Sequence, residues 1–180
     1  MRTTVTIDNK SAKMVAAGQR WLPARSVLGR KPKLGGVAEV VTRSGNFVCM
    51  AFLSPNSRYY LRTFSLKKEN ADLEYWKKVI SKAYARRKTL LDLTNSFRVV
   101  HSDSDGIPST VIDKYDDVFV IQTTSEASDQ ILGDIRDAVV QLFAPKSVVE
   151  RNDIAIREKE GLPLKKGFLF GGEGVAEVAE

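Results

Sequence analysis

Residues that could act as an acid, a base or a metal ligand are concentrated in one segment, at His101, Asp103 and Asp105. His101 is the only histidine of the chain, and a histidine beside carboxylates can serve as a general base. The same aspartates precede Gly106 and Pro108, where short acidic side chains usually accept hydrogen bonds from turn amides. Two interpretations therefore stay open, a small catalytic site and a structural turn, and we favour the turn.

The other reactive residue types add no site. Asp103 could begin a calcium-binding loop, but the twelfth position of that loop is Lys114, where an EF-hand needs glutamate. Cys49, the single cysteine, lies in an apolar segment with no neighbouring base, which is typical of a core residue. One cysteine cannot form an internal disulfide, so a reducing cytoplasm is the expected compartment. We therefore assign no catalytic residue and no metal ligand.

Charge is distributed unevenly along the chain. Residues 1–100 contain 20 Lys and Arg against 6 Asp and Glu, whereas residues 101–180 contain 8 against 16, which leaves the whole chain at +6. A basic half of this kind predicts contact with a polyanion. Arginine pairs with phosphate and aromatic rings stack on unpaired bases, so the cationic and aromatic residues of this half are the candidate RNA ligands. They are Arg20, Trp21, Arg25, Arg30, Lys31, Lys33, Arg43, Arg58, Tyr60 and Arg62.

Two of these assignments depend on local structure. Arg58, Tyr60 and Arg62 fall on one face if residues 58–64 form a regular strand. Trp21 and one of the neighbouring tyrosines could instead be core residues, and this alternative stays open.

The elements that must position these residues follow from periodicity. Alternating apolar residues predict strands over 3–7, 37–42, 46–54 and 58–64, with a short helix near 9–16 capped by Asn9 or Ser11. Residues 1–66 are therefore expected to form a small, mostly β unit.

Residues 67–94 predict a linking helix. Leu73, Trp76 and Ile80 follow helical spacing, and Asn70 is a plausible N-cap. Lys78, Lys82 and Arg86 are four residues apart and share one face. That face is either solvated or contacts phosphate or a neighbouring domain.

Residues 95–173 predict a small α+β unit. Strands are expected at 97–101, 109–113, 117–124, 147–151 and 168–170, with one helix over 126–143 that Pro145 ends. No stretch approaches 18 apolar residues, so no membrane span is predicted, and the N-terminus lacks the apolar run of a secretory signal.

Three groups of residues resemble a known family. They are Gly18–Leu22; His101–Tyr115, with its SDGIP and VIDKY sequences; and Glu150–Asp153 with Arg157–Leu162 and Phe170–Glu173. Together they resemble the N-terminal half of the S-adenosylmethionine-dependent methyltransferases that modify C5 of a cytosine in large-subunit ribosomal RNA. The match is looser over residues 1–64, where that family carries a PUA domain, a small RNA-binding β-barrel.

The resemblance implies an α+β architecture in four parts. A PUA-like barrel is expected at 1–66, a linking helix at 67–94, a central α+β domain at 95–173 and a truncated tail at 174–180. The Rossmann-like methyltransferase domain of the family would follow and is expected to be absent. Its cofactor loop and catalytic cysteine map onto no residue here, so S-adenosylmethionine is implied for a full-length relative and no cofactor for this chain.

The resemblance also names partners. It implies ribosomal RNA and the missing methyltransferase domain, with Asp105, Arg151, Asp153 and Arg157 forming a cleft wall that faces that domain. The alternative for these four residues is a set of surface or interdomain salt bridges.

Three functional hypotheses result. The first is the RNA-recognition portion of the methyltransferase, inactive by itself. The second is a free-standing RNA-binding adaptor without catalytic activity, and the third is a small enzyme that uses His101.

Overall fold

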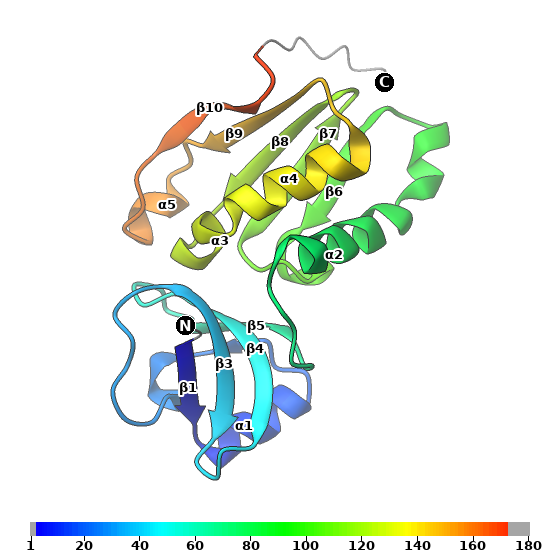
Figure 1. Cartoon of the computed structure of the whole chain (residues 1–180). Helices are drawn as coiled ribbons and strands as arrows, with labels where there is room; N and C mark the ends of the chain where they lie inside the picture. The colour runs from blue at the N-terminus through cyan, green and yellow to red at the C-terminus, as the bar shows by residue number, and fades with distance from the viewer. Residues whose placement is uncertain (1–2, 173–180) are drawn as a thin grey trace.

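The computed structural model describes residues 3–172 and has a mixed α+β architecture. Two five-stranded sheets follow one another along the chain, and the first is curled into a half-barrel (Figure 1). The predicted fold class, α+β with a small, mostly β unit first, is confirmed. The tail expected at 174–180 lies outside the described residues, as does residue 173.

The first sheet has the strand order β1-β3-β4-β5-β2, in which only the β1–β3 pair is parallel. A short helix, α1 (Asn9–Ala16), covers one end, and a single 3-10 turn, η1 (Ala24–Ser26), follows β2. The strands are β1 (Thr3–Ile7), β2 (Trp21–Leu22), β3 (Gly36–Thr42), β4 (Phe47–Leu53) and β5 (Leu61–Ser65).

Two local details differ from the expectations for this unit. Helix α1 is capped by Asp8, whose carboxylate accepts a hydrogen bond of 2.7 Å from the Ser11 amide, and not by Asn9 or Ser11. Strand β5 begins at Leu61, three residues later than predicted, because residues 54–60 form a turn. Arg58, Tyr60 and Arg62 therefore do not share one strand face.

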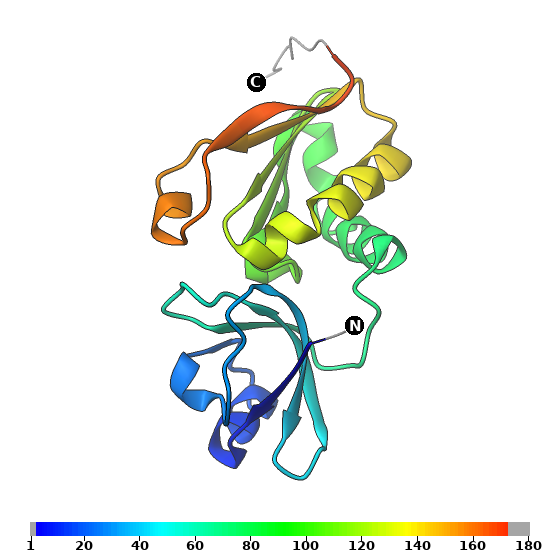
Figure 2. The same cartoon turned by 60° about the vertical axis from the view of Figure 1, so that its left-hand side comes forward.

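The second sheet has the order β10-β9-β8-β7-β6, in which only β8 and β9 are parallel. A parallel pair needs a crossover, which α3 and α4 supply. Helices α2 and α4 pack together on one face of this sheet (Figure 2). The strands are β6 (Ser96–His101), β7 (Thr110–Tyr115), β8 (Val118–Thr123), β9 (Ser147–Asn152) and β10 (Lys165–Phe170). The helices are α2 (Leu73–Ala85), α3 (Glu126–Gln130), α4 (Leu132–Phe143) and α5 (Ile156–Lys159). Two 3-10 turns, η2 (Lys88–Asp92) and η3 (Ser102–Asp105), lie on either side of β6.

The helices also correct the expectations. Asp72, not Asn70, caps α2 by accepting a 3.1 Å hydrogen bond from the Tyr75 amide. The single helix predicted over 126–143 is two helices, interrupted at Ile131, where ψ is 2°. The chain leaves α4 through Ala144 in the left-handed conformation, one residue before Pro145.

Strand β4 is buried on both faces. Cys49, Ala51 and Leu53 belong to the core inside the first sheet, whereas Met50 and Phe52 belong to the core of the second unit. A strand covered on both sides is an almost continuous apolar run, as β4 is. The two units therefore share packed surface.

Aromatic rings join the units on the outer side of β4. The Phe52 ring lies 5.2 Å from Phe64 and 5.9 Å from Trp76, centroid to centroid, and Tyr75 lies 4.8 Å from Trp76. Trp76 comes from α2, so this cluster attaches the linking helix to the first sheet.

Candidate nucleic-acid interface

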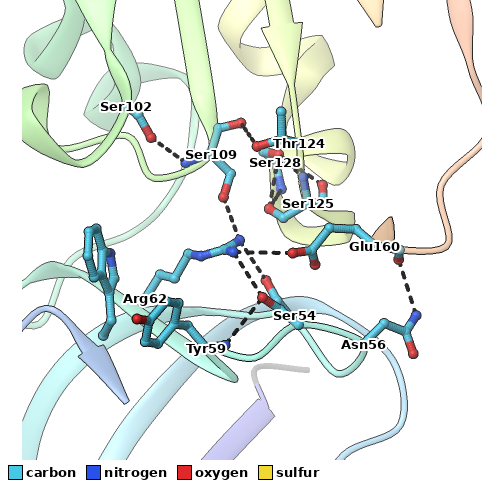
Figure 3. A network of polar contacts seen from close by, with 12 residues as sticks. Ser54, Asn56, Tyr59, Arg62, Ser102, Ser109, Thr124, Ser125, Ser128 and Glu160 are labelled. Carbon is cyan, nitrogen blue, oxygen red and sulfur yellow. Dashed lines mark hydrogen bonds and ion pairs between the residues drawn. The ribbon is translucent and has the colours of Figure 1, made fainter. Parts of the chain in front are cut away.

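Arg62 lies in a polar junction between the two units (Figure 3). Its guanidinium donates to the Ser109 hydroxyl at 2.7 Å and to Glu160 Oε1 at 3.3 Å. Two hydroxyls of the β4–β5 turn, Ser54 and Ser57, accept further hydrogen bonds at 3.3 and 3.0 Å. With 14% of its side chain exposed, Arg62 holds the units together and is not available to RNA phosphate.

Tyr60 is a core residue. Its side chain is buried, and its hydroxyl donates to the carbonyl oxygen of Pro32 at 2.5 Å. Burial raises the pKa of the Tyr60 hydroxyl. The ring cannot stack on a base, and it instead anchors the basic loop that contains Arg30, Lys31 and Lys33.

The other end of that loop rests on α3. The side-chain amide of Gln130 donates to the Gly35 carbonyl at 3.0 Å. A Cβ added at Gly35 would lie 2.6 Å from Cβ of Glu126, so only glycine allows this approach. The loop is thus held at Pro32 and at Gly35, between the curled sheet and the crossover helices.

Trp21 is exposed, in contrast to Tyr60. The residue is 40% exposed, and its ring lies 5.3 Å from the ring of Tyr59, centroid to centroid. The Arg58 guanidinium lies 5.7 Å from the centre of the Tyr59 ring. The indole N–H donates to Asp103 Oδ1 at 2.8 Å, which fixes Trp21 against η3. Two rings and a cation therefore form an open platform at the junction.

The remaining cationic candidates are exposed but do not form one cluster. Arg20 and Arg25 flank β2, and Arg30, Lys31 and Lys33 share the anchored loop. Arg43 lies in the β3–β4 turn, at the end of β3 opposite Gly36 and therefore distant from the junction. Tyr59 was not among the RNA ligands predicted from the sequence, although it stands beside Arg58, and that adjacency was the available signal.

Asp105 is the centre of the turn expected after His101. It is buried and forms ion pairs with Arg86 and with Arg87, the latter at 2.7 Å. Its second oxygen also accepts a 2.7 Å hydrogen bond from the main-chain amide of His101. Burial alone would raise the pKa of Asp105, but the hydrogen bonds from Arg87 and His101 outweigh it and lower the pKa. The carboxylate thus bonds with the His101 main chain, which supports the structural turn.

Arg157 is fully buried and fixes α5 to the sheet. Its guanidinium donates to both carboxylate oxygens of Asp129 at 2.8 Å, to the Thr123 carbonyl at 2.6 Å and to the Pro163 carbonyl at 3.0 Å. Burial would raise the pKa of Asp129, and the hydrogen bonds from Arg157 and Thr123 reverse this and lower it.

The four residues expected to form one cleft wall therefore separate into three places. Asp105 pairs with arginines at the end of α2, and Arg157 pairs with α3. Arg151 and Asp153 form an exposed pair at 3.1 Å near the end of β9. Their shared role was implied by the family resemblance, and a cleft wall that faces a further domain stays a prediction for these residues.

Other site types receive no support within residues 3–172. No group of three or more His, Cys, Asp or Glu in that range is placed to hold a metal ion. No helix there has both the length and the apolar character to cross a membrane. Cys49 is buried, and burial raises the pKa of its thiol.

Comparison with known proteins gives a consistent result. Residues 5–66 match the family of PUA-like domains. Ribosomal RNA large subunit methyltransferase I of Vibrio parahaemolyticus is 32% identical over 177 residues, and that of Tolumonas auensis is 29% identical over 176 residues. These alignments cover 96% and 95% of this chain but only 45% and 44% of the relatives, so the chain spans less than half of their length.

Two solved structures share the fold. A SAM-dependent methyltransferase from Streptococcus mutans superposes with a TM-score of 0.78 at 20% identity, over 96% of this chain and 44% of its own. A methyltransferase complexed with SAH gives a TM-score of 0.79 at 20% identity, over 96% and 43%. The chain therefore contains a PUA-like domain and is homologous, over nearly its whole length, to a part of the ribosomal RNA large subunit methyltransferase I proteins.

Proposed function

We propose that this chain is the RNA-recognition portion of an S-adenosylmethionine-dependent ribosomal RNA methyltransferase that acts on C5 of a cytosine. The observation that carries the proposal is the homology to ribosomal RNA large subunit methyltransferase I proteins, which extends through both sheets. Cofactor binding and methyl transfer belong, in this proposal, to the length of those relatives that the chain does not cover. A reducing cytoplasm, where a single buried cysteine stays a thiol, is the proposed location.

The binding surface in this proposal is narrower than the sequence suggested. It consists of the exposed set Arg20, Trp21, Arg25, Arg30, Lys31, Lys33 and Arg58, joined by Tyr59. Arg62 and Tyr60 are not part of this surface: Arg62 joins the two units, and Tyr60 anchors the basic loop. Arg43 is distant from the surface. The anchored loop and the ring platform both lie where the curled sheet meets the second unit, so RNA would contact both units.

The first test measures RNA affinity against salt. Binding of a labelled fragment of large-subunit ribosomal RNA should weaken by roughly 0.7 log units per log unit of salt for each phosphate neutralised on a single strand. An affinity that does not change between 50 and 400 mM potassium chloride would exclude the polyanion contact.

The second test concerns the cofactor. Calorimetric titration with S-adenosylmethionine should give no heat of binding for this chain, since the proposal locates the cofactor site elsewhere in the relatives. Micromolar binding of S-adenosylmethionine to this chain would contradict the proposed location of the cofactor site.

A further inference from the structure

A cleft separates the first sheet from α2 and has a volume of about 280 Å³. Three parts of the chain form its walls: Arg20 with β5, the exposed side of α2, and the turn η3. These parts are distant in sequence, and the aromatic cluster around Trp76 holds α2 against the sheet and so fixes the width of the cleft.

Three cations line this cleft. Arg20 approaches from the curled sheet, and Lys82 and Arg86 lie one helical turn apart on α2. Arg20 and Lys82 are exposed, and within residues 3–172 neither side chain forms an ion pair. Two cations are therefore free to bind an anion in the cleft.

The carboxylates of the cleft are already occupied. Asp103 accepts hydrogen bonds from the Trp21 indole at 2.8 Å and from the Ser102 hydroxyl at 3.0 Å. Asp105 is bonded by Arg86, Arg87 and the His101 amide. The lowered pKa of Asp105 means that it stays charged and keeps Arg86 in place. Two carboxylates against the three cations that line the cleft leave a surplus of one positive charge.

The size of the cleft and its neighbours indicate which anion it takes. About 280 Å³ is near the lower limit of small-molecule sites, enough for a phosphate with its ribose and too small for a duplex. Trp21 stands at the edge of the cleft through its bond to Asp103, with its ring exposed beside Tyr59. A phosphate in the cleft would place the adjacent base near that ring.

We propose that this cleft binds one phosphodiester of single-stranded RNA, between Arg20 of the barrel unit and Lys82 and Arg86 of α2, with a neighbouring base stacked on Trp21. The inference rests on the proposed RNA-binding function and assigns α2, the linking helix, a direct part in it. In this proposal both units contact the same single strand of RNA.

The test compares Arg20→Gln, Lys82→Gln and the double variant with the wild type. The probe is a fluorescein-labelled single-stranded 12-nucleotide RNA, followed by anisotropy from 50 to 400 mM potassium chloride. Because the cleft holds one phosphodiester, the double variant should lose about fivefold in affinity at 0.1 M salt and reduce the salt slope by about 0.7, as expected for one lost phosphate contact. Each single variant should lose part of this affinity and part of this slope. Both residues are exposed, so circular dichroism should show an unchanged fold.

Lys146→Gln is the matched control. It removes the same charge from an exposed lysine in the α4–β9 connection, which Figure 1 shows at the end of the second unit away from the curled sheet. Its affinity and salt slope should equal those of the wild type.

The outcomes separate this inference from the proposed function. If the wild type binds RNA and the Arg20 and Lys82 variants bind it equally well, the cleft is not a phosphodiester site and the inference fails alone. If the wild type binds no RNA, both fail. Inorganic phosphate and adenosine 5′-monophosphate, titrated at constant ionic strength, test a free phosphate as the ligand. Submillimolar binding of either without displacement of the RNA would overturn the inference.

Discussion

At the scale of single residues, the fold separates side chains that are available to a ligand from side chains that hold the two units together. Tyr60 and Arg62 are close in sequence to the exposed Arg58 and the half-buried Tyr59. Tyr60 is nevertheless buried, and the guanidinium of Arg62 is already bonded to Ser109 and Glu160. Burial and prior hydrogen bonding, not residue type, decide which cations and rings remain available to a ligand.

Trp21→Ala should weaken single-stranded RNA binding by about 1–3 kcal/mol, the usual contribution of one stacked base. Trp21→Phe keeps a ring while losing the bond to Asp103, so it should lose less. Anisotropy titrations at one salt concentration measure both. Equal affinity of the alanine variant and the wild type would exclude stacking at this position.

The pKa of Asp129 gives a second prediction at this scale. Because the folded pKa lies below the ordinary 3.8, the ionised carboxylate stabilises the fold above that value, and this stabilisation is lost as the pH falls below it. Asp129→Asn should cost about 3–5 kcal/mol at pH 7, since it leaves the buried Arg157 without a counter-charge.

Urea unfolding between pH 7 and pH 2.5 measures this effect. The free energy of unfolding of the variant should fall less steeply than that of the wild type below about pH 4. Asp105→Asn provides a second case, because the pKa of Asp105 is also lowered. If the free energy of unfolding depends on pH in the same way for the wild type and both variants, these ion pairs make no pH-dependent contribution to stability.

At the scale of elements, a close approach fixes the basic loop against α3. Gly35→Ala places a methyl group 2.6 Å from Cβ of Glu126 and should cost about 1–3 kcal/mol through overpacking. Gly133→Ala is the matched control, because nothing lies within 4 Å of its added Cβ and the residue is in the first turn of α4. That substitution should stabilise by about 0.5 kcal/mol. Thermal unfolding followed by circular dichroism compares the two, and a Gly35 variant as stable as the wild type would contradict this contact.

Much of this element structure follows from periodicity, and the exceptions have physical causes. The strand at 3–7 and those of the second sheet were predictable because the alternation of apolar and polar residues indicates which face of a strand is buried. The interruption at Ile131 was not, because Ile131, Leu132 and Ile135 keep an apolar side on both pieces of the helix. The role of Arg62 was not predictable either, since its partner Glu160 is 98 residues away.

At the scale of the whole molecule, the shared packing of β4 and α2 predicts one cooperative unit. Thermal unfolding should give a single transition by calorimetry, with coincident midpoints for far-ultraviolet circular dichroism and tryptophan fluorescence. Phe52→Ala should destabilise the whole chain by about 3–5 kcal/mol, because its ring packs against both Phe64 and Trp76. Two separate transitions in the wild type would show that the sheets unfold independently.

The double burial of β4 also limits how the chain can be divided. A fragment ending near residue 66 would retain every strand of the curled sheet yet leave Met50, Phe52 and Phe64 without cover. Such an apolar surface promotes aggregation during recombinant expression. A useful minimal fragment for spectroscopy would therefore extend at least through α2, or replace those three side chains with polar ones.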